Sequence, residues 1–180
     1  TVYEKLFELM SDEESYYLTA DPLRHPLVFY FGHTATFFIN KLVLAKLIDK
    51  RINPTFESIF AIGVDEMSWD DLNQSNYKWP RIAEIQAYRD AVKVKILELI
   101  DTLPLSMPIS WESPFWAIMM GIEHERIHLE TSSVLIRQLP LESVKPNNFW
   151  KTCPLDTPIV QNELLHVKGS TLRLEKKKDD

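Results

Sequence analysis

Cysteine and glycine are both scarce in this chain, and each shortage excludes a class of protein. The 180 residues include one cysteine, Cys153, so a disulfide framework within the chain is impossible. Nothing in its context, between Thr152 and Pro154, marks this thiol as reactive, and we interpret it as inert. The four glycines form no phosphate-binding loop of the G-x-G-x-x-G or G-x-x-x-x-G-K type. So little cysteine fits a reducing compartment, and we expect a cytoplasmic protein.

A surplus of positive charge is also missing. The chain has 20 Lys and Arg against 26 Asp and Glu, for a formal net charge of -6. Phosphate binding requires a basic surface, so nucleic acid is not expected as a partner. No unbroken apolar run reaches the roughly 18 residues of a membrane span, and the first residues lack a signal-peptide pattern. We therefore expect no membrane partner. Because the chain does not begin with Met, we interpret it as a piece of a longer protein.

Apolar residues recur at helical spacing in four stretches. Hydrophobic residues make up 45% of the chain and charged residues 26%, which is enough for an ordinary globular core. The predicted helices cover about 2–17, 26–49, 81–103 and 113–138. The first half of the second helix is apolar nearly all round, which predicts burial on several sides. Ser113 is expected to cap the fourth helix, with Pro114 in its first turn.

Strand patterns are missing before residue 140, so these helices predict an all-α, up-and-down four-helix bundle. A connection of about 51–79 separates the second and third helices. It contains the acidic and aromatic run Asp65–Asp71, whose role stays open between lining a site and docking another domain.

The C-terminal region differs, because prolines interrupt it and two short stretches alternate like strands. These stretches are 164–168 and 170–174, on either side of Gly169. An isolated hairpin is marginal in water, so we interpret them as the start of a second domain. The predicted division is 1–145 for the helical bundle and 146–180 for a linker and first strands.

His124 and His128 form the most informative pattern, since residues four apart on a helix lie on one face. Two imidazoles so placed can bind one transition-metal ion. A helical wheel directs both away from a charged stripe containing Glu123 and Arg126, which predicts that the histidines face the interior or a cleft.

The intervening Glu125 completes H-E-x-x-H, the zinc peptidase motif in which Glu is the general base. That function needs a third ligand downstream and a strand upstream. The downstream candidates Glu142, Glu163 and His166 are poorly placed, and no strand precedes the helix. Glu125 could instead orient an imidazole or form a salt bridge at the rim, and the sequence does not decide between these roles.

His33 is the better third ligand, although it lies far upstream. It sits in the most apolar predicted helix, where an unpaired imidazole would be costly to bury. Alone it would be interpreted as a core histidine bonded to a carbonyl group. With His124 and His128 on another helix, three imidazoles can form a facial site that suits iron or zinc. His25 and His166 are interpreted as surface or structural residues.

Several long runs of the sequence resemble the ovothiol synthases. They are residues 24–34, 37–42, 53–60, 63–71 and 124–132. The tail at 165–174 is similar to the first strands of that family's second domain. The related ergothioneine sulfoxide synthases share the plan but match these runs less closely.

The resemblance implies a DinB-like four-helix domain followed in the same chain by a formylglycine-generating-enzyme-like domain. It implies a non-haem Fe(II) centre held by His33, His124 and His128, with zinc or nickel able to occupy it on purification. The implied reaction couples cysteine to the imidazole of histidine with O2 and gives 5-histidylcysteine sulfoxide. Much of the family's substrate pocket belongs to the second domain, so no catalytic residue is assigned here and full activity of this chain alone is not expected.

Three alternatives remain open from the residues. One is a zinc hydrolase with Glu125 as base, and another is a DinB-like metal-dependent thiol transferase. The third is a metal-free helical bundle that serves as an interaction module, in which all three histidines are bonded within the protein.

Overall fold

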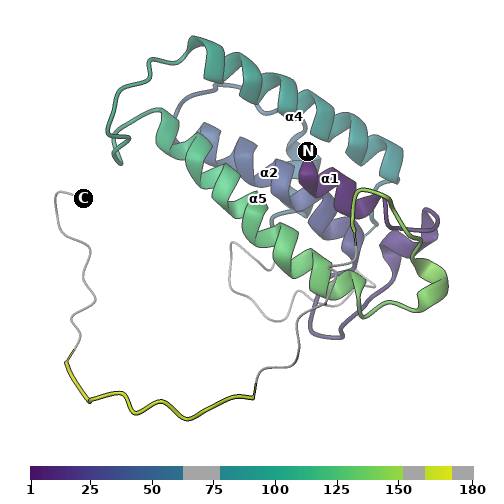
Figure 1. Cartoon of the computed structure of the whole chain (residues 1–180). Coiled ribbons are helices and arrows are strands. Elements are labelled where there is room, and N and C mark those ends of the chain that lie inside the picture. The colour runs from purple at the N-terminus through teal and green to yellow at the C-terminus, as the bar shows by residue number, and fades with distance from the viewer. Residues whose placement is uncertain (63–77, 152–160, 172–180) are drawn as a thin grey trace. The chain divides into compact units, whose positions relative to one another are not determined.

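The computed structural model describes residues 1–62, 78–151 and 161–171, and these form helices and connecting segments without a strand. Two units can be distinguished, residues 1–150 and 151–180. The first contains all the helices (Figure 1), with a single isolated β-bridge between Met10 and Val144. The predicted all-α class is confirmed for the described residues.

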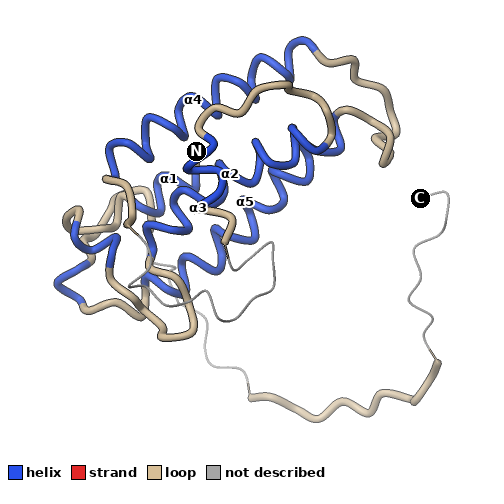
Figure 2. The backbone as a smooth tube through the Cα atoms, turned by 180° about the vertical axis from the view of Figure 1, so that it is seen from behind, coloured by secondary structure: helices blue, strands red, loops and turns tan. Residues whose placement is uncertain are grey.

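Helix α2 (Leu27–Leu44) is the central element, and it lies between α4 (Ile82–Thr102) and α5 (Phe115–Ile136) in Figures 1 and 2. Fourteen of its residues are buried. By length and composition alone it could cross a membrane, although polar residues interrupt its apolar run. However, 78% of the helix is buried inside the protein, as in the core helix of a globular domain. It ends before Ala45 rather than near residue 49, and Lys46 then adopts a left-handed φ of 56°.

The first predicted helix is shorter than its pattern indicated. Helix α1 (Val2–Phe7) has a capping box between Thr1 and Glu4, and a separate 3-10 turn, η1, covers Glu14–Tyr17. Asp12 accepts hydrogen bonds from both the backbone N–H and the hydroxyl of Ser15. Such a local bond competes with continued helix, so the stretch 2–17 is broken in two.

A helix that the sequence reading missed, α3 (Pro54–Ile59), lies in the predicted connection. The Asn53 side chain accepts from the N–H of Phe56, and Pro54 occupies the first turn. The Glu57 carboxylate is buried and pairs with Arg51 at 3.1 Å. The remaining connection, 63–77, lies outside the described residues, and with it the run Asp65–Asp71.

The start of α5 corrects one prediction. The capping position is Pro114, and the hydroxyl of Ser113 is buried without a hydrogen-bond partner. Ser113 lies one residue too early to cap a helix that begins at Phe115, although its carbonyl accepts from the N–H of Trp116 at 2.9 Å. Helix α4 begins and ends close to the prediction.

The described part of the C-terminal unit contains neither helix nor strand. Residues 164–168, predicted as a strand, are extended coil and fully exposed, so that prediction is wrong for this chain. A strand requires a partner to accept its hydrogen bonds, and none pairs with this stretch among the described residues. Cys153 and most of the second predicted strand lie outside the described residues.

Candidate metal centre

Three histidines from two helices converge on one point. His33 comes from α2, and His124 and His128 come from α5. One nitrogen from each ring lies within 4.8 Å of those of the other two. The i,i+4 spacing puts two imidazoles side by side, and the close contact of α2 with α5 brings the third to them.

The tautomer of His33 follows from the contact that its Nδ1 atom makes on the side away from the other histidines. Its Nδ1 lies 2.6 Å from the carbonyl oxygen of Phe60, the residue that follows α3. A carbonyl can only accept, so Nδ1 carries the proton and donates. In a neutral ring Nε2 is then a bare lone pair directed at the other histidines. This is the arrangement in which a backbone carbonyl orients a metal-binding imidazole.

The three Nε2 atoms cannot all be satisfied by one another. His124 Nε2 lies 3.2 Å from Nε2 of His33 and also 3.2 Å from Nε2 of His128. If His124 Nε2 is protonated, its proton can point at one neighbour. If it is not, it faces the lone pair of His33. Neutral rings therefore make one good hydrogen bond at a time, whereas a cation between them would accept all three lone pairs.

Burial keeps the two α5 histidines, His124 and His128, uncharged. It lowers the pKa of His128 to about 4 and that of His124 to about 2, with the neighbouring imidazoles adding to the shift. His33 is fully buried and His128 is 8% exposed. Near neutral pH the two α5 imidazoles are thus in the deprotonated form that binds metals.

Aromatic rings hold the imidazoles in place. His124 stacks on Phe37 with ring centroids 3.6 Å apart and an angle of 6° between planes. His33 stacks on Phe29 at 5.1 Å, and Tyr30 lies against His128 at 5.8 Å. Stacking leaves Nδ1 of His124 buried without a hydrogen-bond partner. The His124 ring is therefore oriented by packing against Phe37, whereas His33 is also held by its bond to the Phe60 carbonyl.

Glu125 takes the salt-bridge role of the two that the sequence left open. Its carboxylate lies 3.6 Å from the guanidinium of Arg89 on α4. The predicted charged stripe is present as well, since Arg126 donates to Glu123 at 2.9 Å on the exposed side of α5. A carboxylate paired to arginine is a poor general base, so the geometry does not favour the zinc peptidase interpretation.

The other two histidines are not part of the cluster. His25 is buried, stacks on Phe29 at 4.2 Å and lies 3.2 Å from the carbonyl oxygen of Ile62. That contact is structural, as predicted. His166 is exposed in the C-terminal unit.

Sequence reasoning missed two neighbours of the cluster. Phe37 could have been found, because it lies four residues after His33 on the same helix face. The carbonyl of Phe60 gives no such signal, since its contact with His33 depends on how α3 folds back onto α2.

The arrangement offers three neutral nitrogen donors from two packed helices, a set that suits Zn, Fe, Ni or Cu ions. No curated protein matches the chain. The family model of the DinB superfamily matches residues 1–132, which include all three histidines and four of the five α-helices in full. The chain therefore belongs to the DinB superfamily.

Proposed function

We propose that this chain is the metal-bearing domain of a non-haem Fe(II) sulfoxide synthase that joins cysteine to histidine with O2. The observation that carries the metal part of the proposal is the convergence of three imidazole nitrogens, from His33, His124 and His128, within 4.8 Å of one another. Members of this superfamily are often metal-dependent enzymes. The resemblance of the His33 and His124 regions to ovothiol synthases supports the finer assignment.

The donor set fits the proposed metal. Three neutral imidazoles leave coordination positions free for substrates, as non-haem iron oxygenases require. When bound, Fe(II) would supply the redox chemistry with O2 that no side chain here provides. The protein would contribute orientation of the ligands through the Phe60 carbonyl and the Phe37 ring, and a largely dry environment.

The proposed reaction balances without a further reductant. The thiol of cysteine and the ring C–H of histidine each give up a hydrogen as the C–S bond forms. One oxygen atom of O2 leaves with them as water, and the other remains on sulfur as the sulfoxide. The four electrons that reduce O2 therefore come from the two substrates.

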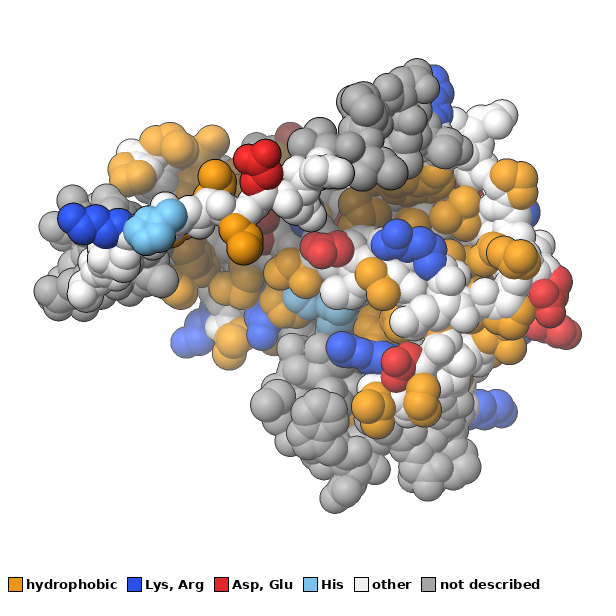
Figure 3. Space-filling view, turned by 60° about the horizontal axis from the view of Figure 1, so that its bottom comes forward, with side chains coloured by type: hydrophobic (Ala, Val, Ile, Leu, Met, Phe, Trp, Pro, Cys, Tyr) orange, Lys and Arg blue, Asp and Glu red, His pale blue; other side chains and the backbone are white. Residues whose placement is uncertain are grey.

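A cavity beside the cluster could hold an amino acid. It measures about 330 Å³ and is bordered by His128, Thr131, Tyr30, Arg24 and Asp21, among others. Figure 3 shows histidine atoms at the surface of this unit, with charged and hydrophobic side chains around them. Arg24 and Asp21 carry the opposite charges that would recognise the carboxylate and the ammonium group of a free amino acid.

The proposal includes a second domain of the formylglycine-generating-enzyme type in the same protein, following the helical domain and completing the substrate pocket. A reduced thiol substrate and Fe(II) also favour the cytoplasm as the place of action. A thiol transferase with the same metal site is the competing function, and it would use thiol without consuming O2.

The first test is an anaerobic Fe(II) titration of the chain and of the variants His33→Ala and His124→Ala. His166→Ala is the matched control, because it removes an exposed histidine outside the cluster. We expect one Fe(II) per chain in wild type and in the control, and loss of binding in both cluster variants. Unchanged affinity in His33→Ala would overturn the three-histidine site.

Substrate chemistry needs a second readout. With Co(II) in place of iron, added cysteine should produce the charge-transfer absorption of a metal-bound thiolate, and histidine should alter the spectrum further. With iron and with the proposed second domain present, O2 uptake should depend on both amino acids. Thiol-dependent turnover without O2 uptake would favour the transferase instead.

A further inference from the structure

Arg89, on α4, is a buried cation that contacts both helices carrying the histidines. Its exposed fraction is 4%. Lysine or arginine at such a position is rare unless its charge and its donors are matched. Among the described residues, its hydrogen-bond and ion-pair partners belong to α1, α2 and α5, so this side chain of α4 joins four helices at one point.

On α2 the contacts flank His33. The Nη1 group of Arg89 donates to the carbonyl oxygen of Phe31 at 2.7 Å and to the hydroxyl of Thr34 at 2.8 Å. Thr34 directly follows His33 in the sequence, and Phe31 lies two residues before His33. Both hydrogen bonds have a charged donor, so they belong to the stronger class.

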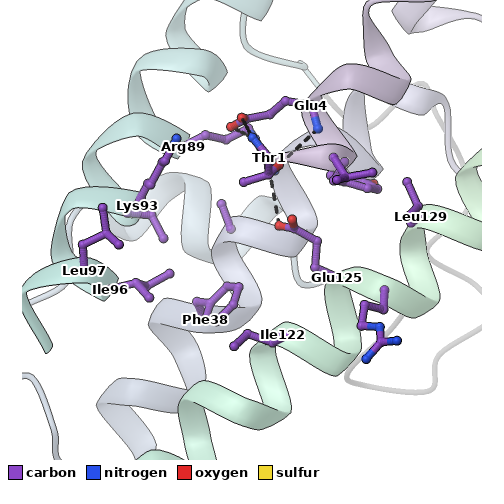
Figure 4. A pocket seen from close by; sticks show the side chains of 15 residues that line it. Thr1, Glu4, Phe38, Arg89, Lys93, Ile96, Leu97, Ile122, Glu125 and Leu129 are labelled. Atoms are coloured by element: carbon purple, nitrogen blue, oxygen red, sulfur yellow. Dashed lines mark hydrogen bonds and ion pairs between the residues drawn. The ribbon is translucent and has the colours of Figure 1, made fainter. Parts of the chain in front are cut away.

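On α5 the contact lies between the other two histidines. Nη2 of Arg89 is 3.6 Å from the carboxylate of Glu125, the residue that follows His124 and precedes His128 by three. Nε faces Glu4 of α1 at 3.4 Å. Figure 4 shows Arg89, Glu4 and Glu125 gathered at one end of a mostly apolar pocket.

Arginine suits this place better than lysine. Its planar fork presents donors in fixed directions, and here they reach two different helices at once. The aromatic rings of Tyr3 and Phe31 lie about the guanidinium, with centroids 5.3 and 5.0 Å from its central carbon. These rings exclude water and restrict the side chain to one orientation.

We propose that Arg89 is a positioning residue for the three-histidine site, fixing the segment of α2 around His33 against the segment of α5 around His124 and His128. This rests on the proposed metal-binding function. Ligand atoms must be held to within about 0.5 Å for a metal site to work, and a link between the two ligand helices supplies that restraint. Arg89 contacts no ligand itself and acts through Thr34, Phe31 and Glu125.

The test compares two glutamates on either side of His124. Glu125→Gln removes the charge facing Arg89, whereas Glu123→Gln removes a charge from the exposed pair with Arg126. Each variant is titrated with Co(II) at a temperature where circular dichroism shows it fully folded. We expect Glu125→Gln to weaken Co(II) binding about tenfold and to shift the visible bands of the bound ion, and Glu123→Gln to do neither.

Thr34→Val tests the same link from α2, and it serves if Glu125→Gln does not fold. It removes one acceptor of Arg89 without changing shape, and we expect weaker Co(II) binding and a band shift again. The double variant should lose less than the sum of the two single losses in free energy, because both act through Arg89. If wild type binds Co(II) and both single variants match its affinity and spectrum, Arg89 only stabilises the fold and the proposal is wrong. If wild type binds no Co(II), the proposed function itself fails and this inference falls with it.

Discussion

Two polar clusters, one around Arg89 and one around the three histidines, lie along the contact between α2 and α5. Their buried polar groups are matched in opposite ways. Around Arg89 a cation is surrounded by acceptors: two carboxylates, a carbonyl and a hydroxyl. Around His33, His124 and His128, three imidazole nitrogens lie within 4.8 Å of one another and no carboxylate belongs to the group. One cluster contains its own counter-charge, and the other is arranged for a charge that must come from outside.

Within one domain, the arginine cluster is therefore assigned a structural role and the histidine cluster a role in binding. The arginine cluster should contribute to folding whether or not a metal ion is bound. The histidine cluster should contribute only when an ion is present, because its nitrogens otherwise face one another. The two clusters should therefore respond differently to mutation, metal and ligand.

The largest effect is expected from Arg89→Met. Removing the cation leaves Glu125 partly buried without its ion-pair partner and leaves Glu4 only the N-terminal ammonium of Thr1. Breaking a buried pair in this way costs about 3–5 kcal/mol of unfolding free energy. Urea denaturation measures the loss. Arg126→Ala, which breaks an exposed pair on α5, should change stability by less than about 1 kcal/mol. A loss below 1 kcal/mol for Arg89→Met would show that its cluster is not structural.

Metal should stabilise the histidine cluster by a smaller amount. Free Zn(II) at 100 times its dissociation constant should add about 2.7 kcal/mol, provided that it binds only the folded chain. For a chain of this size that corresponds to roughly 2–4 °C in melting temperature per kcal/mol. A chelator should reverse the shift, and His124→Ala should abolish it. An equal shift in His124→Ala would place the ion elsewhere.

The two clusters also differ in what the sequence discloses. The histidine pair is visible because i,i+4 spacing fixes a shared face whatever the tertiary structure, and His33 stood out as a polar residue in an apolar helix. Arg89 gave a similar signal that was overlooked, since it falls on the apolar face of α4 with Ile85 and Val92.

The fold shows the same division between local and long-range information. Helices α2, α4 and α5 were predictable from apolar period and proline positions. Helix α3 was not, because it is six residues long and depends on Asn53 as a cap within a stretch without clear period. The break after α1 depends on one aspartate–serine contact, which periodicity does not detect.

Arg24 offers a contrast to Arg89, because it borders the cavity beside His128 and has no ion pair among the described residues. If that cavity holds an amino acid, Arg24→Ala should weaken binding of histidine or cysteine to the metal-loaded chain about tenfold. An exposed charge-assisted contact amounts to roughly 1.4 kcal/mol, which is that factor. Calorimetric titration gives the constants. Metal affinity should not change, and a variant that loses metal instead would connect Arg24 to the ligands.

The smallest effect is expected at Thr131, and it compares two imidazoles within the histidine cluster. The hydroxyl of Thr131 lies 3.5 Å from Nδ1 of His128, at the limit of a hydrogen bond, whereas His33 Nδ1 is 2.6 Å from its carbonyl acceptor. A weak contact orients little, so Thr131→Val should change Zn(II) affinity by less than about threefold, well under 1 kcal/mol. Competition with a chromophoric chelator resolves such a difference. A tenfold loss would mean that this contact shortens when the ion binds, and His128 would then be oriented by its hydroxyl partner as His33 is by its carbonyl.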